Sequence, residues 1–485
     1  MNILSVAFEV APLAKSGGLA DVVASLAIEW KKQGHTPIIL IPKFYFIDAD
    51  KLGFKPTGLT LVVPMGYWNE YATLLKGKLP NTDVDVYLLE HNGYYGRDGI
   101  YGAPSEFGDN DRRFIFLARA AFEAAKALKF KPDVIHSHDY HTAFTMPLLK
   151  IYHRKDPFFA KTAGVFTIHN LAYQGRFAPQ PTMEYTGFGM EQFYPGSWFE
   201  YYGGTNYMKT GIMFADKVTT VSPTYSREIR SPYFGEGLHD VLNARGGDLV
   251  GILNGIDYAE WNPKTDKKLP INYDANTLDK KKKLKSKFLA EHGITGKDHL
   301  PLIGIISRLT EQKGIDLIIN VLEDYLWNDR FVFALIGSGE AHYQNYFNYI
   351  KHKYPNSSIV YIGYNEALSH YLYGASDFLL IPSRFEPCGL TQMYAMKYGT
   401  LPLVRATGGL SDTVREFIPS EKQGNGFVFW NYNAGDFQFA LNRSATIYYS
   451  SDMDIARNNA MAEDFSSNKC AEKYIECFKW ALEKV

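Results

Sequence analysis

The sequence predicts an α/β protein built from two doubly wound, mostly parallel sheets. Short apolar segments alternate with stretches of helical periodicity, the pattern of a parallel sheet covered by helices. The same rhythm restarts after Gly251-Ile252-Leu253-Asn254-Gly255. The chain has 485 residues, more than the ~250–300 that a single hydrophobic core supports. We therefore expect two Rossmann-like domains, with a boundary between residues 252 and 253.

The first half opens with a strand, a turn and a helix. Apolar residues 3–10 predict the strand and residues 14–18 the turn. Residues 19–32 have helical periodicity that ends before Gly34, a common helix stop. Further buried strands are expected at 37–41, 84–90, 134–137, 165–169 and 218–221.

The second half repeats this alternation. Strands are expected at 302–307, 331–337, 359–363, 377–383, 401–404 and 426–429. A lysine run at 280–285 precedes them and could be read as a patch for nucleic acid. Leu284, Phe288 and Leu289 supply a buried stripe at helical spacing, which favours a solvated helix face instead.

Composition excludes several classes of protein. Hydrophobic residues make up 46% and charged residues 21% of the chain, as in ordinary globular proteins. Lysine and arginine total 51 against 52 acidic residues, so no global field attracts nucleic acid or anionic lipid. We expect no secretory signal, because the N-terminus runs directly into a strand, and no apolar run approaches ~20 residues. We expect a cytoplasmic protein without nucleic-acid or membrane partners.

The three cysteines, Cys388, Cys470 and Cys477, are too few for a disulfide framework or a four-ligand zinc site. Cys470 and Cys477 lie seven residues apart on one face of an expected helix, which is typical of core thiols. This usage fits a reducing compartment.

A glycine-rich turn joins the first strand to the first helix. Lys15-Ser16-Gly17-Gly18-Leu19 is neither a G-x-G-x-x-G fingerprint nor a Walker A loop. Its two readings are a plain turn and an anion site, and Lys15 favours the anion site because a cation stands beside backbone amides. Residues 408–414 echo residues 17–23, which predicts a second helix start of the same kind.

Two later segments carry candidate charged groups. Arg308 and Lys313 follow an expected strand and could clamp a diphosphate leaving group, or could be two surface cations. Glu386 lies on a loop before an expected helix start at Gly389. Its carboxylate could orient a sugar hydroxyl or balance charge at an oxocarbenium-like centre; a helix-capping role is the alternative.

Together these motifs resemble the bacterial glycogen synthase and plant starch synthase family over essentially the whole chain. The matching stretches, in the family's order, are 15–22, His138-Asp139, 169–175, 221–225, 253–257, 307–314, 384–390 and 402–410.

The resemblance implies a GT-B fold, with the two domains facing across a cleft and a C-terminal helix at about 463–485 completing the first domain; residues 253–462 would form the second. It implies retaining transfer of glucose from ADP-glucose to an α-1,4-glucan acceptor, without a metal or cofactor. The expected location is the cytoplasm, or a plastid if the chain is a processed eukaryotic form. The oligomeric state stays open.

The resemblance also assigns residues by motif position. The catalytic set would be His169, Arg308, Lys313 and Glu386, with the His169 carbonyl near the reacting carbon. Acceptor contacts would come from Tyr95 and Asp139. Donor contacts would come from Lys15, Gly18, Asp21, Asn254, Tyr364, Gly389, Leu390 and Thr391.

Several alternatives remain at this point. His136, His138 and His141 could suggest a metal site, but no matching carboxylate set accompanies them. Where many GT-B relatives carry a ribose-binding glutamate, this chain has Tyr394, so ribose contacts must come from elsewhere, such as Thr391. The aromatic segment 183–208 is read either as packing or as a glucan guide.

Three other functions compete with the synthase prediction. They are another GT-B transferase that uses a UDP-sugar, a nucleotide-sugar epimerase, and a glucan-binding protein that has lost catalysis. A binder without activity is expected to lack Arg308, Lys313 or Glu386, and all three are present.

Overall fold

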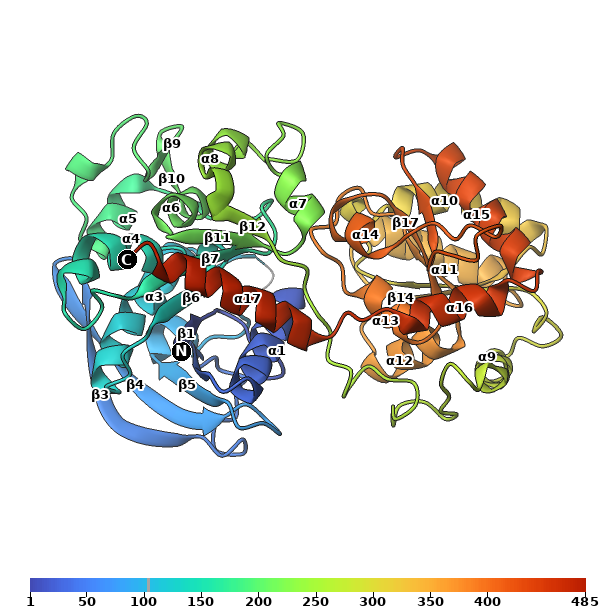
Figure 1. Ribbon diagram of the computed structural model, residues 1–485, viewed down its shortest axis with the longest axis horizontal. Coiled ribbons are helices and arrows are strands. Elements are labelled where there is room, and N and C mark those ends of the chain that lie inside the picture. Colours follow the sequence, from blue (N-terminus) through green and yellow to red (C-terminus); the bar gives the residue numbers. More distant parts are fainter. Residues whose placement is uncertain (103–104) are drawn as a thin grey trace. The chain divides into compact units, whose positions relative to one another are not determined.

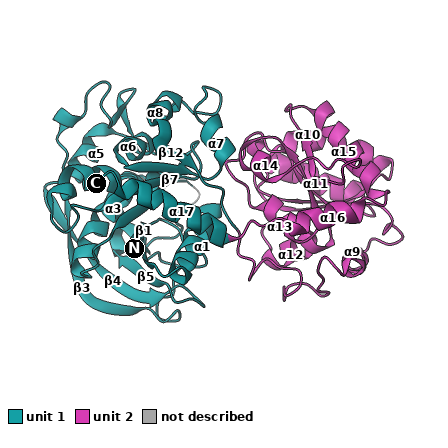
Figure 2. Cartoon of the chain, viewed as in Figure 1, with its two compact units in different colours: residues 1–255, 467–485 teal, residues 256–466 magenta. Residues whose placement is uncertain are grey.

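The computed structural model describes residues 1–102 and 105–485, which form two compact units (Figure 2). Unit 1 contains Met1–Gly255 and Ser467–Val485, and unit 2 contains Ile256–Ser466. The sequence prediction placed the boundary after residue 252 and the return near residue 463. The α/β class predicted from the sequence is confirmed in each unit.

Unit 1 is built on a nine-stranded sheet (Figure 1). Seven of its strands are parallel, and β3 and β4 add an antiparallel edge. In spatial order the strands are β12 (Leu249–Gly251), β11 (Lys217–Thr220), β7 (Ala163–Ile168), β6 (Val134–His138), β1 (Asn2–Val6), β2 (Thr36–Pro42), β5 (Asp85–Glu90), β4 (Trp68–Lys78) and β3 (Lys55–Met65).

Helices cover this sheet, and the last one comes from the end of the chain. Helix α17 (Ser467–Leu482) packs against α1 (Gly18–Lys32) and β7, and the Trp30 indole donates to the Ala471 carbonyl at 3.2 Å. Cys470 and Cys477 are free thiols on its buried face, as predicted. The remaining helices are α2 (Asn92–Tyr95), α3 (Asn110–Ala127), α4 (Thr145–Pro147), α5 (Pro179–Thr186), α6 (Tyr207–Phe214), α7 (Pro223–Glu228) and α8 (His239–Ala244).

The β3–β4 hairpin was not among the predicted strands. Both strands have 11 residues and pair in antiparallel register from Met65 opposite Trp68. Burial alternates along the end of β3, with Leu61, Val63 and Met65 inside and the residues between them exposed. This period of two is the signal that could have identified the hairpin.

The aromatic segment 183–208 divides between the two readings given above. Phe199 and Tyr207 are buried, whereas Tyr194, Trp198 and Tyr202 are exposed. A small three-stranded sheet organises the segment, in the order β8 (Arg176–Phe177), β10 (Gly204–Asn206), β9 (Glu200–Tyr201). Packing therefore accounts for part of the segment.

Unit 2 is a six-stranded, wholly parallel sheet. Its strands in spatial order are β15 (Ser358–Ile362), β14 (Val332–Gly337), β13 (Leu302–Ile306), β16 (Phe378–Ile381), β17 (Leu401–Arg405) and β18 (Phe427–Phe429). Its helices are α9 (Leu278–Glu291), α10 (Ile315–Trp327), α11 (Ala341–Lys353), α12 (Glu366–Ala375), α13 (Thr391–Lys397), α14 (Gly408–Thr413), α15 (Ala434–Tyr448) and α16 (Met453–Ala462).

Two local predictions meet different outcomes. The internal echo is confirmed, because α1 begins at Gly18 and α14 begins at Gly408, each directly after a turn. The lysine run does lie on a helix, α9, with Leu284 buried. However, Lys281 and Lys285 are buried as well, so a fully solvated face was wrong for these two side chains. Among the described residues, no helix is both long and apolar enough to cross a bilayer.

Candidate active site

In unit 1 the candidate residues follow the carboxyl ends of parallel strands, where α/β folds place their ligand sites. The first group is the glycine-rich turn between β1 and α1. Val10 and Ala14 exchange two backbone hydrogen bonds of 2.9 Å, which folds the chain back before the turn. Lys15 Nζ lies 2.7 Å from Asp21 Oδ1 on the first turn of α1. These predicted donor residues, Lys15, Gly18 and Asp21, are thus brought together.

The amides of this turn are not all available to a ligand. Glu9 is buried, and its Oε2 accepts from the Ser16 amide at 2.5 Å and from the Gly17 amide at 3.2 Å. The anion-site reading of the turn is therefore corrected in part, since a carboxylate of the chain itself occupies these two amides. The amides of Gly18 and Leu19 open the helix, where no intrahelical acceptor exists.

The second group joins the ends of β6 and β7. Asp139 Oδ1 accepts from the His169 amide at 2.7 Å, so the predicted acceptor residue holds the predicted catalytic residue. Asp139 has a φ of 54°, a conformation that costs a non-glycine residue of order 1–3 kcal/mol. Burial raises the pKa of Asp139 to about 7, although the backbone amides of His169 and Asn170 oppose the shift.

The His169 imidazole has a partner that the sequence reasoning missed. Its Nε2 lies 3.1 Å from Nδ1 of His138, whose Nε2 lies 3.3 Å from the Ser5 hydroxyl. Burial lowers the pKa of His169 to about 3, and it lowers the pKa of His138 as well. Both rings are therefore neutral near pH 7, and the hydrogen bond between them does not use His169 Nδ1.

Two further predicted residues of unit 1 lie in the interior. Tyr95 is 0% exposed and its hydroxyl donates to the Arg113 carbonyl at 2.9 Å, so the expected direct contact with an acceptor was wrong for this structure. The tyrosine packs beneath the surface because Phe8 and Phe44 surround its ring. Asn254 is buried, and in the described part of the chain its Oδ1 has no hydrogen-bond partner.

In unit 2, loops after β13 and β16 bring a cation and a carboxylate together. Lys313 Nζ lies 2.6 Å from Glu386 Oε2, and the Ser383 hydroxyl donates to the same oxygen at 3.0 Å. Arg308 is exposed where β13 ends. Removal of a well-placed active-site donor typically costs ~10²–10³ in rate, which sets the scale expected for Lys313.

A buried arginine fixes the loop that carries Glu386. Arg405, at the end of β17, donates from Nε to the Ser383 carbonyl at 2.9 Å and also binds the Arg384 carbonyl. Gly389 has a φ of 73°, which favours glycine, and α13 begins two residues later at Thr391, with Leu390 as its N-cap. Tyr364 is 76% exposed after β15.

The described residues contain one trio with metal-ligand geometry, Glu260, Glu366 and His370. Lys268 already lies among them, paired with Glu366 and 3.2 Å from His370 Nε2. An ammonium group thus supplies the positive charge at this position, and the trio does not include any predicted catalytic residue.

Comparison with known proteins agrees with these local features. The family model for the starch synthase catalytic domain matches residues 2–244, and the model for group 1 glycosyl transferases matches residues 289–458. The chain is 43% identical to glycogen synthase 1 of Geobacter sulfurreducens, over 100% of this chain and 97% of that protein. It is 39% identical to glycogen synthase of Bacillus subtilis, over 99% and 98% of the two chains.

The chain belongs to the glycogen and starch synthase family. It is therefore a glycosyltransferase, and the family predicted from the motifs is confirmed. The catalytic domain of starch synthase IV from Arabidopsis thaliana, bound to ADP and acarbose, is similar with a TM-score of 0.90, at 33% identity and covering 99% of each chain. A sucrose-phosphate synthase from Thermosynechococcus elongatus, with a TM-score of 0.60 at 15% identity, shares the fold.

For this family member, sequence reasoning found the charged groups but not the groups that hold them. Lys15, Asp21, Asp139, His169, Lys313 and Glu386 were all named from motifs. Glu9, His138 and Arg405 were missed in these roles. Their signal was their position at or just beyond the end of a buried strand. Their partners lie as far as 133 residues away in the sequence, as for His138 and Ser5.

Proposed function

We propose that the chain transfers glucose from ADP-glucose to the non-reducing end of an α-1,4-glucan and releases ADP. The Lys313–Glu386 pair carries the proposal. It sets an ammonium group beyond the carboxyl ends of the strands, where it could stabilise a departing diphosphate, and a carboxylate beside it that could contact a sugar. Arg308 adds a second cation at the same edge. The buried, unpartnered Asn254 Oδ1 would accept a glucose hydroxyl.

We propose further that the transfer needs no metal and retains the anomeric configuration. Arg308 and Lys313 would balance the charge that builds on the diphosphate. Glu386 is held by Lys313 and Ser383, which supports an electrostatic role rather than a nucleophilic one. In same-face transfer the bond from the anomeric carbon to the diphosphate oxygen breaks as the acceptor hydroxyl forms the new bond, and the hydroxyl proton passes to the departing phosphate.

A reducing compartment such as the cytoplasm fits the cysteine chemistry. Cys388, Cys470 and Cys477 are buried free thiols, and burial raises the pKa of Cys470 to about 12. Free thiols of this kind persist in a reducing compartment, where disulfides are rare.

Glycogen incubated with ADP-glucose or UDP-glucose, with and without EDTA, tests the proposal. Chain length and released nucleotide are measured for the native protein and for Lys313→Ala. We expect chain growth with ADP-glucose that EDTA does not reduce, and a loss of ~10²–10³ in kcat in the variant. The matched control is Lys353→Ala, which removes an exposed lysine paired with Glu323.

Other outcomes would overturn specific parts of the proposal. Preference for UDP-glucose would contradict the choice of donor, and inhibition by EDTA would contradict metal independence. Conversion of the donor without growth of a chain would indicate an epimerase. A folded native protein that turns over neither donor would contradict the proposed reaction as a whole.

A further inference from the structure

The carboxylate of Glu9 is an unusual acceptor beneath the glycine-rich turn. It receives four hydrogen bonds from three residues: the Ser16 amide at 2.5 Å, the Gly17 amide at 3.2 Å, the Ser16 hydroxyl at 2.7 Å and the Tyr101 hydroxyl at 2.6 Å. Glu9 is 3% exposed.

Consecutive amides in a turn form a concave site that commonly binds a phosphate or another anion. Here two of these amides, from Ser16 and Gly17, already point at a carboxylate inside the protein. A ligand phosphate cannot take the same two donors while Glu9 holds them. The outward donors of the turn are then the next amides along the chain, Gly18 and Leu19, at the start of α1.

Glu9 also joins two segments that line one hollow of unit 1. The hollow measures about 520 Å³ and is lined in part by Lys15, Ser16, Phe46 and Tyr101. Glu9 Oε2 binds the Ser16 amide, while Oε1 binds the Tyr101 hydroxyl from a segment 92 residues away in the sequence. The Tyr101 ring is itself fixed by stacking on Phe8 and His141, so the anchor at this end is rigid.

We propose that Glu9 is a positioning residue for the sugar-nucleotide donor. Its carboxylate fills the inner amide site of the glycine-rich turn and sets the orientation of Lys15, which lines the hollow, and of the Gly18 amide that follows in the chain. Glu9 does not touch the donor and acts only through the turn. This inference rests on the proposed function, because it assigns the turn to donor binding.

Substitutions at position 9 can separate the effect of side-chain length from the effect of charge. A glutamine at position 9 has the same length: its oxygen can accept from both amides, and its NH₂ group can donate to the hydroxyls of Ser16 and Tyr101, which also accept. An aspartate keeps the charge but is one methylene shorter, so it cannot span the turn and Tyr101 together. An alanine removes all four bonds.

The experiment compares Glu9→Gln, Glu9→Asp and Glu9→Ala, with the KM for the donor, the KM for glycogen, kcat and the thermal midpoint measured for each. Misplacement of a binding group by about 1 Å can cost up to ~10²-fold. We expect Glu9→Asp and Glu9→Ala to raise the donor KM at least about tenfold, with the glycogen KM little changed. Glu9→Gln should stay within about threefold of the native protein.

Glu29→Ala is the matched control, because Glu29 lies on the same helix α1 and pairs with Lys32, at 2.6 Å, on that helix. Its kinetic constants should equal those of the native protein. If Glu9→Ala does not fold, Glu9→Asp carries the comparison with Glu9→Gln.

Two results would overturn the inference. One is a folded Glu9→Asp or Glu9→Ala with a donor KM within about twofold of the native value. The other is a loss in Glu9→Gln as large as in Glu9→Ala, which would assign the effect to charge. The native protein is assayed first with both ADP-glucose and UDP-glucose. Use of UDP-glucose would refute the proposed donor, and the Glu9 series would then be measured with that donor.

Discussion

The two units share a parallel sheet but bury their polar groups in different ways. Unit 1 places four imidazoles, His136, His138, His141 and His169, near the ends of adjacent strands. Burial lowers the pKa of all four, so each is neutral at pH 7. Two of them contact hydroxyls without charge, His136 Nε2 with Thr167 at 2.7 Å and His138 Nε2 with Ser5 at 3.3 Å. In the described part of the chain, Nδ1 of His136 and Nδ1 of His141 are buried without a hydrogen-bond partner.

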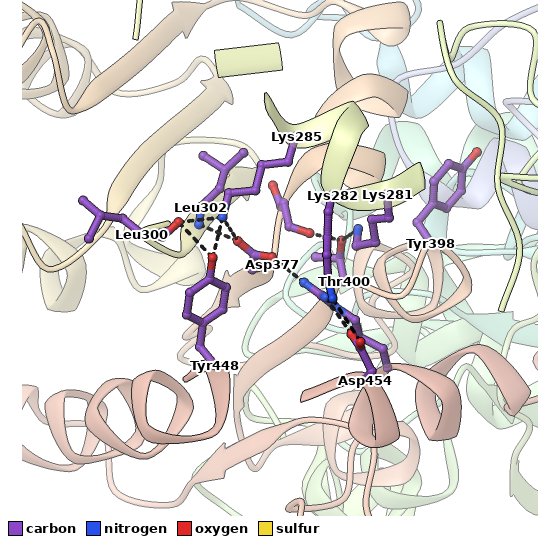
Figure 3. Close-up of polar contacts among 12 residues, drawn as sticks. Lys281, Lys282, Lys285, Leu300, Leu302, Asp377, Tyr398, Thr400, Tyr448 and Asp454 are labelled. Atoms are coloured by element: carbon purple, nitrogen blue, oxygen red, sulfur yellow. Dashed lines mark hydrogen bonds and ion pairs between the residues drawn. The ribbon is translucent and has the colours of Figure 1, made fainter. Parts of the chain in front are cut away.

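Unit 2 uses charge instead. Asp377 is buried beside β16 and pairs with Lys285 at 2.6 Å and with Arg457 from α16 (Figure 3). The Leu302 amide donates to the same carboxylate at 2.8 Å. These partners hold the pKa of Asp377 below its usual value, although burial by itself raises it.

The difference predicts which changes lower the folding stability of each unit. A neutral imidazole costs stability when the unfolded chain can take up a proton, so unit 1 should be sensitive to acid. A buried ion pair tolerates acid until its carboxylate is protonated, but it cannot lose a partner without leaving a charge unpaired. Three experiments test this contrast.

The largest expected effect is in unit 2, from Asp377→Asn. The change leaves the buried Lys285 without a carboxylate and takes one of two from Arg457, which also pairs with Asp454 at 3.1 Å, so we expect a loss of ~3–5 kcal/mol in the free energy of unfolding. Hydrogen exchange read by mass spectrometry resolves the effect by unit. Asp454→Asn is the control, since Asp454 is about half exposed and its loss leaves Arg457 still paired with Asp377, so it should cost much less. A loss below about 1 kcal/mol for Asp377→Asn would contradict the unpaired-charge argument.

The second test concerns acid and unit 1. Burial lowers the pKa of His141 to about 3 from 6.5, so its contribution is present above pH 6.5 and is lost as the pH falls towards 3. Each such imidazole should lower the free energy of unfolding by roughly 1.4 kcal/mol for every pH unit below 6.5. His141 stacks on Tyr101 at 4.7 Å, and a phenylalanine can replace that contact. His141→Phe should therefore reduce the loss of unit 1 stability between pH 6.5 and 5.5 by about one imidazole's share.

His352→Gln is the control for this pH series, because His352 is exposed on α11 in unit 2. The measurement is the free energy of unfolding from hydrogen exchange at each pH. An unchanged pH slope in His141→Phe would show that His141 does not carry the acid sensitivity.

The smallest expected effect is Lys281→Met in unit 2. Lys281 Nζ donates to the Gly374 carbonyl at 2.7 Å and to Thr400 at 2.9 Å, and burial lowers its pKa well below the usual value (Figure 3). The protonated ammonium group is therefore less favourable in the folded chain than in the unfolded chain, a cost that shrinks as the pH rises towards 10.5. Methionine avoids that cost, so we expect a gain of about 1 kcal/mol at pH 7 that shrinks with rising pH. A loss of stability at pH 7 would contradict this reading.

Much of the fold could be predicted from the sequence because parallel strands are short, apolar and bounded by turns. The six strands predicted in the second half all correspond to strands of unit 2. The first predicted strand, residues 3–10, ends at Val6 in the structure, because the chain then turns into the Val10–Ala14 pair. The β3–β4 hairpin was missed, since its exposed face includes apolar residues such as Val62 and Tyr71, so the alternation is clearer in the burial than in the residue types.

The candidate site shows the same division between what local sequence predicts and what only the tertiary structure decides. The sequence by itself determined the family, the two parallel sheets and the charged residues at strand ends, because motifs and apolar periodicity are local. Only the tertiary structure decided that Glu9 meets Tyr101, that His138 meets His169 and that Tyr95 lies in the core. These contacts join residues that are up to 92 positions apart. Strand order and register bring such residues together, and neither can be read from one segment of sequence.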